Sequence, residues 1–202
     1  MKDKLSQAFL PNRFRGHAVM LGAFILGLIY FITIMTGFSA ALGLTAGLIT
    51  APIGFLAGAA TIYIVRKAVN LEIRGLKQEA KHNGIELSEI PSLKAGDLLE
   101  TSKELYKDKQ SWKVVLISLA KFPIGIASFT FITAYLSLSL TLIASPIIGG
   151  YYKAEILKIG GNIINTPLEF AAATFAGVVI FIVGSNATEK LSKIYMRLNS
   201  EI

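Results

Sequence analysis

Residues 18–65 contain no aspartate, glutamate, lysine or arginine, and this uncharged run limits the fold more than any other feature of the sequence. The hydrocarbon core of a bilayer is about 30 Å thick, and a helix needs about 20 apolar residues to cross it. The run is therefore long enough for two crossings with a tight turn between them. Two further uncharged runs, residues 122–152 and 170–188, supply two more crossings. The sequence predicts an integral membrane protein with four spans.

The composition points the same way. Charged residues make up 16% of the chain and hydrophobic residues 53%, whereas a soluble domain carries about 25% charged residues. The formal net charge of +7 would suggest nucleic acid as the partner of a soluble protein. In a membrane protein the position of the charges relative to the bilayer is more informative, and nucleic acid is not an expected partner.

We expect an all-α fold, in which four helices pack as two helical hairpins within a single membrane domain of residues 1–202. Local signals mark the helix ends: Pro52 suits a first turn, Asn83-Gly84 suits a helix end, and Thr166 with Glu169 forms a capping box around Pro167. An insert of residues 67–119 separates the hairpins. The expected spans are residues 18–41, 48–66, 120–145 and 168–187.

Basic residues are distributed unevenly between the two sides of such a bundle. All lysines and arginines except Lys153 and Lys158 fall in the N-terminus, in residues 66–121 or in the C-terminus. Loops rich in these residues stay in the cytoplasm. We therefore expect a multi-pass protein of the cell (plasma) membrane with both termini and the insert in the cytoplasm.

The two halves of the chain resemble each other. A shift of 98 residues places Phe24 on Phe122, Gly27 on Gly125 and Phe31 on Phe129. If this match reflects a repeat, each half is a hairpin that enters and leaves on the same side. The match predicts a parallel internal repeat about an axis normal to the membrane.

The insert contains a candidate partner surface. Asp97 and Glu100 are placed to cap a short helix. Its apolar stripe could lie on lipid or bind a partner, or it could pack on the cytoplasmic extension of the second helix, and the sequence leaves these alternatives open. The stripe consists of Leu98, Leu99, Leu105 and Tyr106.

Two further groups are candidates for sensing. Hydroxyl residues on one face of the third helix form a polar seam, either for hydrogen bonds between helices or for a small ligand. The connection before the fourth helix offers a signal or ligand surface, although its tyrosines also suit interfacial anchoring and Glu169 suits a cap. The seam is Thr130, Thr133, Ser137 and Thr141; the surface is Tyr151, Tyr152, Lys153, Glu155 and Glu169.

Catalytic chemistry is not expected. The chain has no cysteine, and its two histidines, His17 and His82, lie far apart in the sequence. His17 is expected at the headgroup level and His82 at a solvated helix end. No serine has a base at a suitable spacing, so we expect no enzyme, metal site or cofactor. The uncharged runs hold no acid, which argues against a proton- or sodium-driven transporter.

One stretch of the chain resembles a known family. Asp108 precedes Trp112 by four residues, and this segment leads into Phe122-Pro123-Ile124-Gly125. The combination of Asp108, Trp112, Pro123 and Gly125 resembles the "putative sensor" domain, a four-span module usually found at the N-terminus of bacterial and archaeal sensor histidine kinases. The resemblance implies a membrane module that receives a signal. No kinase domain follows the fourth helix in this sequence, so the output is expected from another chain.

Three functions remain open at this point. A sensor module would relay a membrane or outer-surface signal to a cytoplasmic signalling protein in trans. A small channel or transporter would work as a homo-oligomer. A structural protein would organise membrane lipids, which are expected partners in every case.

Overall fold

The computed structural model describes the whole chain except residues 1–10, 48, 93–96, 153–157, 160–161 and 164–165. Helices dominate the described part, so the all-α prediction is confirmed. Between the last two helices, Lys158 pairs with Ile163 in a short antiparallel ladder. The elements are α2 (Pro11–Thr45), α3 (Ala51–His82), α4 (Leu98–Lys107), α5 (Lys109–Tyr152), β1 (Lys158–Ile159), β2 (Asn162–Ile163) and α6 (Pro167–Ser200).

In the described part, four helices are long and apolar enough to cross a membrane, as predicted: α2, α3, α5 and α6. Each runs beyond its expected span. Helix α3 continues to His82 and α6 to Ser200, so both project well past their apolar segments. These extensions carry charged and polar residues that the site described below uses.

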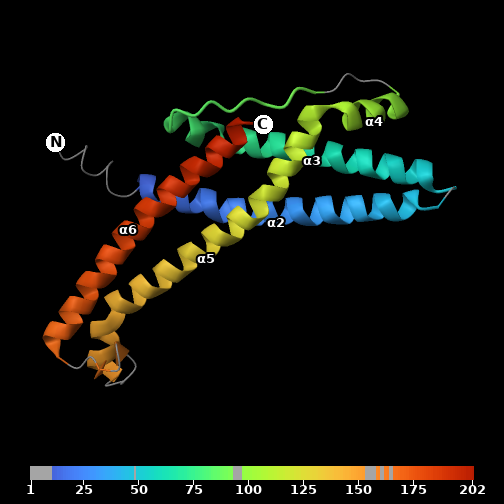
Figure 1. Cartoon of the computed structure of the whole chain (residues 1–202). Helices are drawn as coiled ribbons and strands as arrows, with labels where there is room; N and C mark the ends of the chain where they lie inside the picture. Colours follow the sequence, from blue (N-terminus) through green and yellow to red (C-terminus); the bar gives the residue numbers. More distant parts are fainter. Residues whose placement is uncertain (1–10, 48, 93–96, 153–157, 160–161, 164–165) are drawn as a thin grey trace.

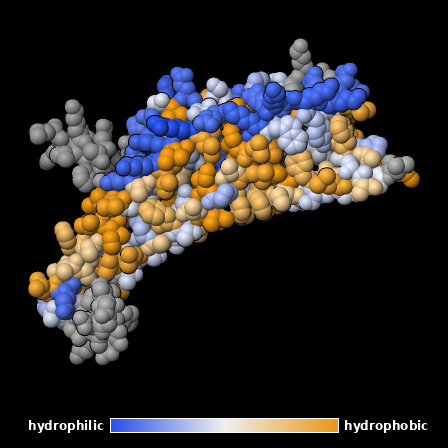
Figure 2. All heavy atoms as spheres, viewed as in Figure 1, coloured by the Kyte–Doolittle hydropathy of each residue, from blue (hydrophilic) through white to orange (hydrophobic). Residues whose placement is uncertain are grey.

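The helices form two hairpins that cross and then diverge (Figure 1). Helices α2 and α3 make one hairpin, and α5 and α6 make the other. The α2–α3 turn and the start of α6 lie at opposite ends of the molecule, while α4 lies alongside α3. Polar residues gather along one edge, over α4 and the helix ends near it, and apolar residues cover the arms (Figure 2).

Two glycines allow α2 and α5 to cross closely. A Cβ atom on Gly27 would lie 2.8 Å from the carbonyl oxygen of Lys121. A Cβ atom on Gly125 would lie 2.8 Å from the Cα atom of Phe24. Both contacts are with backbone, which cannot rotate away, so only glycine fits at either position.

The aromatic contacts at this crossing are reciprocal. Phe24 stacks on Phe129 with ring centroids 4.6 Å apart, and Phe31 stacks on Phe122 at 4.3 Å. Exchanging each residue for its partner in the 98-residue shift turns one contact into the other. A two-fold axis between equivalent units produces such pairs. The crossing therefore supports the parallel repeat that the sequence predicts.

Local signals at the helix ends act as expected. Pro52 lies in the first turn of α3, and Gly84 follows its C-cap with a φ of 69°. Asp97 accepts a hydrogen bond from the Leu98 amide at the start of α4. At α6 the capping box is complete, because Thr166 Oγ1 accepts from the Glu169 amide and Glu169 Oε2 accepts from the Thr166 amide.

Substituting Gly27 tests the close crossing. We expect Gly27→Ala to lower the free energy of unfolding by about 1–3 kcal/mol, because the new methyl group forces two backbones apart. Gly22→Ala is the matched control, since a Cβ there meets nothing within 4 Å. Denaturant titration of the purified protein, followed by circular dichroism, measures both. Equal stability of the two variants would contradict the crossing.

Candidate functional site

A buried ion pair lies where the four long helices meet. Glu72 on α3 and Lys121 on α5 approach to 2.8 Å between Oε2 and Nζ. Their side chains are 1% and 0% exposed, respectively. Charged side chains are almost never buried to this degree unless they are paired. The pair is therefore the most constrained polar feature of the described bundle.

The remaining two helices supply hydrogen bonds to this pair. The hydroxyl of Tyr30 on α2 donates to Glu72 Oε2 at 2.6 Å, and that of Tyr195 on α6 donates to Oε1 at 2.6 Å. Lys121 Nζ also donates to the Asn199 side-chain oxygen at 2.7 Å. We call Tyr30, Glu72, Lys121, Tyr195 and Asn199 the charge cluster. Every long helix contributes to it.

The aromatic rings of the charge cluster also face the ammonium. Lys121 Nζ lies 5.1 Å from the Tyr30 ring centroid and 5.8 Å from that of Tyr195. Ring faces at these distances attract a cation. Each tyrosine thus donates a hydrogen bond to the carboxylate and presents the face of its ring to the ammonium. The cluster contains no nucleophile activated by a base; it holds two opposite charges in a fixed arrangement.

The energetics of this arrangement depend on geometry. Removing two charges from water costs several kcal/mol per ion, and mutual attraction offsets that cost only when the remaining hydrogen bonds are made. Here the carboxylate accepts from three groups and the ammonium donates to two. A displacement that separates them would leave a buried charge without compensation. Helix positions that separate the two charges only partly are therefore energetically unfavourable.

Sequence reasoning missed this cluster, because it searched for acids only inside the uncharged runs, and Glu72 lies outside them. Glu72 follows the uncharged run of residues 18–65, and Lys121 directly precedes the run of residues 122–152. The spacing of apolar residues along α3 did carry a signal. Val65, Val69 and Ile73 are buried on α3, and Glu72 lies on the same helical face.

A second polar contact joins three helices. The His17 side chain on α2 hydrogen-bonds through Nε2 to the Tyr135 hydroxyl on α5. Thr188 Oγ1 on α6 lies 3.3 Å from the same hydroxyl. His17 is partly buried at this contact, and its expected depth at the headgroup level stays a prediction. His82 lines a small polar cavity of about 200 Å³ together with Glu79 and Glu189.

Arg66 fastens the insert to α3. Its guanidinium pairs with the Asp108 carboxylate and donates to Ser111 Oγ at 2.5 Å and to the Pro91 carbonyl oxygen at 2.9 Å. Partial burial alone would raise the pKa of Asp108, but hydrogen bonds from Ser111 and Arg66 outweigh it and hold this pKa below its usual value. Asp108 thus stays ionised while it links α3 to the start of α5.

The segment after α3 runs back along that helix. The Asn70 side chain donates to the Ile90 carbonyl oxygen at 3.1 Å and accepts from the Ile90 amide at 2.8 Å. Glu89 pairs with Arg74 at 2.8 Å and with Lys77 at 3.2 Å. Hydrogen bonds from Arg74 and then Lys77 lower the pKa of Glu89. The insert is therefore attached to α3 at several successive positions.

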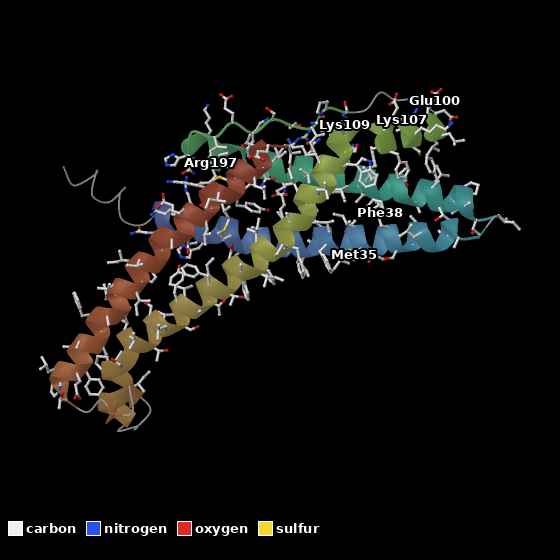
Figure 3. The ribbon with its side chains drawn as sticks, viewed as in Figure 1. Met35, Phe38, Glu100, Lys107, Lys109 and Arg197 are labelled. Atoms are coloured by element: carbon white, nitrogen blue, oxygen red, sulfur yellow. The ribbon has the colours of Figure 1, made fainter. Side chains whose placement is uncertain are left out.

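The residues that carry the family resemblance have structural roles here. Asp108 caps α5 by accepting from the Gln110 and Ser111 amides. Trp112 Nε1 donates to the Tyr106 carbonyl oxygen at 2.9 Å, and its ring stacks on Phe38, which lies between α2 and α3 (Figure 3). Pro123 lies inside α5, just before Gly125 at the helix crossing.

The apolar stripe predicted on the insert is divided between two directions. Leu98 and Leu99 are 76% and 55% exposed. Leu105 is buried in the core next to α3, and the Tyr106 hydroxyl donates to the Phe55 carbonyl oxygen at 3.0 Å. Packing on the second helix, one of the alternatives left open, therefore holds for Leu105 and Tyr106. Tyr106 makes this contact with the apolar part of α3, at Phe55, rather than with the extension beyond Arg66.

The polar seam predicted on α5 lies on the exposed face of the described chain, so its two alternatives, bonds between helices and a small-ligand site, both stay predictions. The four hydroxyl residues are exposed: Thr130, Thr133, Ser137 and Thr141. Thr141 donates to the Ser137 carbonyl oxygen within the same helix at 2.8 Å. The bond between helices comes instead from Ser139, which donates to the Gly177 carbonyl oxygen on α6 at 2.9 Å.

The predicted signal surface lies largely outside what the structure describes. Lys153 and Glu155 fall outside the described residues, and only the backbone of Tyr151 and Tyr152 is described, as the end of α5. Glu169 is described and caps α6. Among the described residues, no group of three potential metal ligands comes together.

Comparisons with known proteins give one match. A family model described as "Putative sensor" matches residues 20–200, which is nearly the whole chain. Neither the curated proteins nor the solved structures that were compared with the chain match it.

Breaking the buried pair tests its place in the bundle. We expect Glu72→Gln to lower the free energy of unfolding by about 3–5 kcal/mol, because Lys121 loses its counter-charge without access to water. The double substitution Glu72→Gln with Lys121→Met should recover a large part of this loss. Denaturant titration of the single and double variants measures the coupling.

Glu86→Gln is the control, since Glu86 is exposed. If Glu72→Gln destabilises no more than this control, the pair is not buried as described.

Proposed function

The chain belongs to the "Putative sensor" family, and we propose that it is a non-enzymatic membrane sensor that relays a change in the membrane or at its outer surface to a cytoplasmic partner. The observation that carries this proposal is the charge cluster, in which all four long helices bind one ion pair at the point where the hairpins cross.

The cluster couples the angle between the hairpins to an electrostatic contact. The arms beyond the crossing are apolar and diverge (Figures 1 and 2), so lipid or a ligand at the outer surface acts on them directly. A change in their angle moves Tyr30, Glu72 and Lys121 relative to one another. Because a buried ion pair tolerates little separation, the bundle favours discrete arrangements, as a two-state switch requires.

The same helices carry the insert, which is the proposed output. Arg66 lies less than about two turns from Glu72 on α3, and it holds Asp108 and Pro91. Helix α5 carries Lys121 and, nearer its start, Trp112. A movement of α3 against α5 therefore reaches the insert without an intervening flexible linker. Leu99 remains exposed there for a partner.

The orientation we propose places the insert in the cytoplasm. Lys107, Lys109 and Arg197 lie along the polar edge that α4 and the helix ends share (Figure 3), and basic residues favour the cytoplasmic side. We expect Lys103→Cys to react with an impermeant maleimide from the cytoplasmic side only, and Leu168→Cys from the outer side only. The native chain has no cysteine, so sealed vesicles of known orientation give an unambiguous answer. The reverse pattern would overturn the orientation.

The coupling itself is testable because Trp112 is the single tryptophan of the chain. We expect its emission to shift when the full protein is moved from vesicles of short-chain to vesicles of long-chain phosphatidylcholine. The double variant Glu72→Gln/Lys121→Met should lose this shift, since its helices no longer share an ion pair. Gly22→Ala should retain it. If the Trp112 emission of the native protein does not change with bilayer thickness, the proposal that the chain senses the membrane is contradicted.

One observation favours a second candidate, an ion or proton transporter. Buried charged residues in membrane bundles are typical of ion pathways, and Glu72 is a buried carboxylate where the four long helices meet, beyond the uncharged part of α3. Flux of protons or cations across the same vesicles distinguishes the two functions. Flux that Glu72→Gln abolishes would favour transport, whereas tight vesicles with a Trp112 shift support the sensor.

A further inference from the structure

A groove of about 910 Å³ separates α3 from the insert. One wall is the exposed side of α3 from Leu56 to Arg74, and the other is formed by α4 and by Glu89 to Ser92. The α3 wall extends about 27 Å along the helix axis. The volume lies within the range typical of sites for small molecules.

The two ends of this groove differ in chemistry. At the end nearest the α2–α3 turn, Leu56, Ala60 and Leu98 line it, and all three are exposed apolar residues. At the other end Lys67 and Arg74 line it. Tyr63 lies between them, 46% exposed, and Lys67 Nζ approaches its ring centroid to 5.5 Å. The groove thus changes from apolar to basic along its length, with an aromatic residue at the transition.

The charges of the basic end are only partly neutralised. Arg66 forms an ion pair with Asp108, and Arg74 and Lys77 both pair with Glu89. One carboxylate is thus divided between two cations. Together with Lys67, which is exposed and lies over the Tyr63 ring, this leaves an excess of positive charge at the basic end. An anion placed there gains favourable interactions without displacing a buried ion pair.

We propose that this groove binds an anionic phospholipid, with its phosphate against Lys67 and Arg74 and an acyl chain along Leu56, Ala60 and Leu98. A phospholipid is complementary to the groove along its length, because its anionic phosphate matches the basic end and its hydrocarbon chain matches the apolar end. The position also fits, because the groove follows α3 from its apolar segment into its basic extension, where the headgroups of a bilayer lie. Basic residues at a membrane surface attract such lipids.

Binding there would join α4 to α3 through a shared ligand. Leu105 on α4 and Arg66 on α3 both line the groove, and Arg66 also holds the start of α5 through Asp108. The inference names a lipid ligand for a site separate from the charge cluster, and it stands whether or not the chain is a sensor.

Native mass spectrometry of the full chain in detergent tests the proposal with dihexanoyl-phosphatidylglycerol as the probe. We expect Lys67→Gln to weaken binding about fivefold and Lys67→Gln with Arg74→Gln about 25-fold, since each basic residue near an anionic headgroup contributes roughly that factor. Lys103→Gln and Lys107→Gln are the matched controls, because these lysines on α4 do not line the groove. Equal losses in the controls would overturn the site.

Two further arms separate a lipid from other anions. Ala60→Trp fills the apolar end without changing charge, so it should weaken binding of the lipid by at least as much as Lys67→Gln. Dihexanoyl-phosphatidylcholine should bind more weakly than phosphatidylglycerol. Inorganic phosphate should compete poorly. If phosphate competes as well as the lipid, or if Ala60→Trp has no effect, the ligand is a soluble anion and the proposal is wrong.

Discussion

The fold depends on keeping one carboxylate and one ammonium out of water in a bundle that faces hydrocarbon. Glu72 and Lys121 achieve this only because Tyr30, Tyr195 and Asn199 satisfy their remaining hydrogen bonds. Those partners come from helices that must approach closely, which Gly27 and Gly125 permit at the α2–α5 crossing. The ion pair and the crossing therefore depend on each other: an incorrect hairpin angle would leave a charge uncompensated, and that penalty disfavours it.

The contacts at the crossing are symmetric, but the polar residues are not. Phe24 and Phe31 exchange with Phe122 and Phe129 across the repeat. The position equivalent to Lys121 in the first half is Ala23, which is buried as a small residue. The two similar apolar hairpins thus differ in the Glu72–Lys121 pair, because the first half has no lysine at the position equivalent to Lys121. The asymmetry distinguishes the halves, because Arg66 and Asn70 of α3 attach the insert.

The sequence predicted what local chemistry determines. Uncharged runs, the Thr166 capping box and the Asn83-Gly84 helix end depend on neighbours in the chain, so they could be found without a structure. The Glu72–Lys121 contact joins residues 49 positions apart and depends on a crossing angle that no local signal encodes. The exposed position of the seam residues Thr130 to Thr141 could not be predicted for another reason. Lipid is as apolar as the bundle interior, so hydroxyl residues in a span do not reveal which face turns inward.

Helix α3 connects the parts of the molecule that matter for function. It contributes Glu72 to the charge cluster, Arg66 and Asn70 to the attachment of the insert, and one wall of the basic groove. These residues are interleaved along one helix, so a displacement of α3 cannot change the ion pair without also moving the insert. A rigid helix between a buried charge and an exposed surface transmits position directly. In the proposed sensor, the short insert, with Leu99 facing outward, is where a change within the membrane becomes accessible to another molecule.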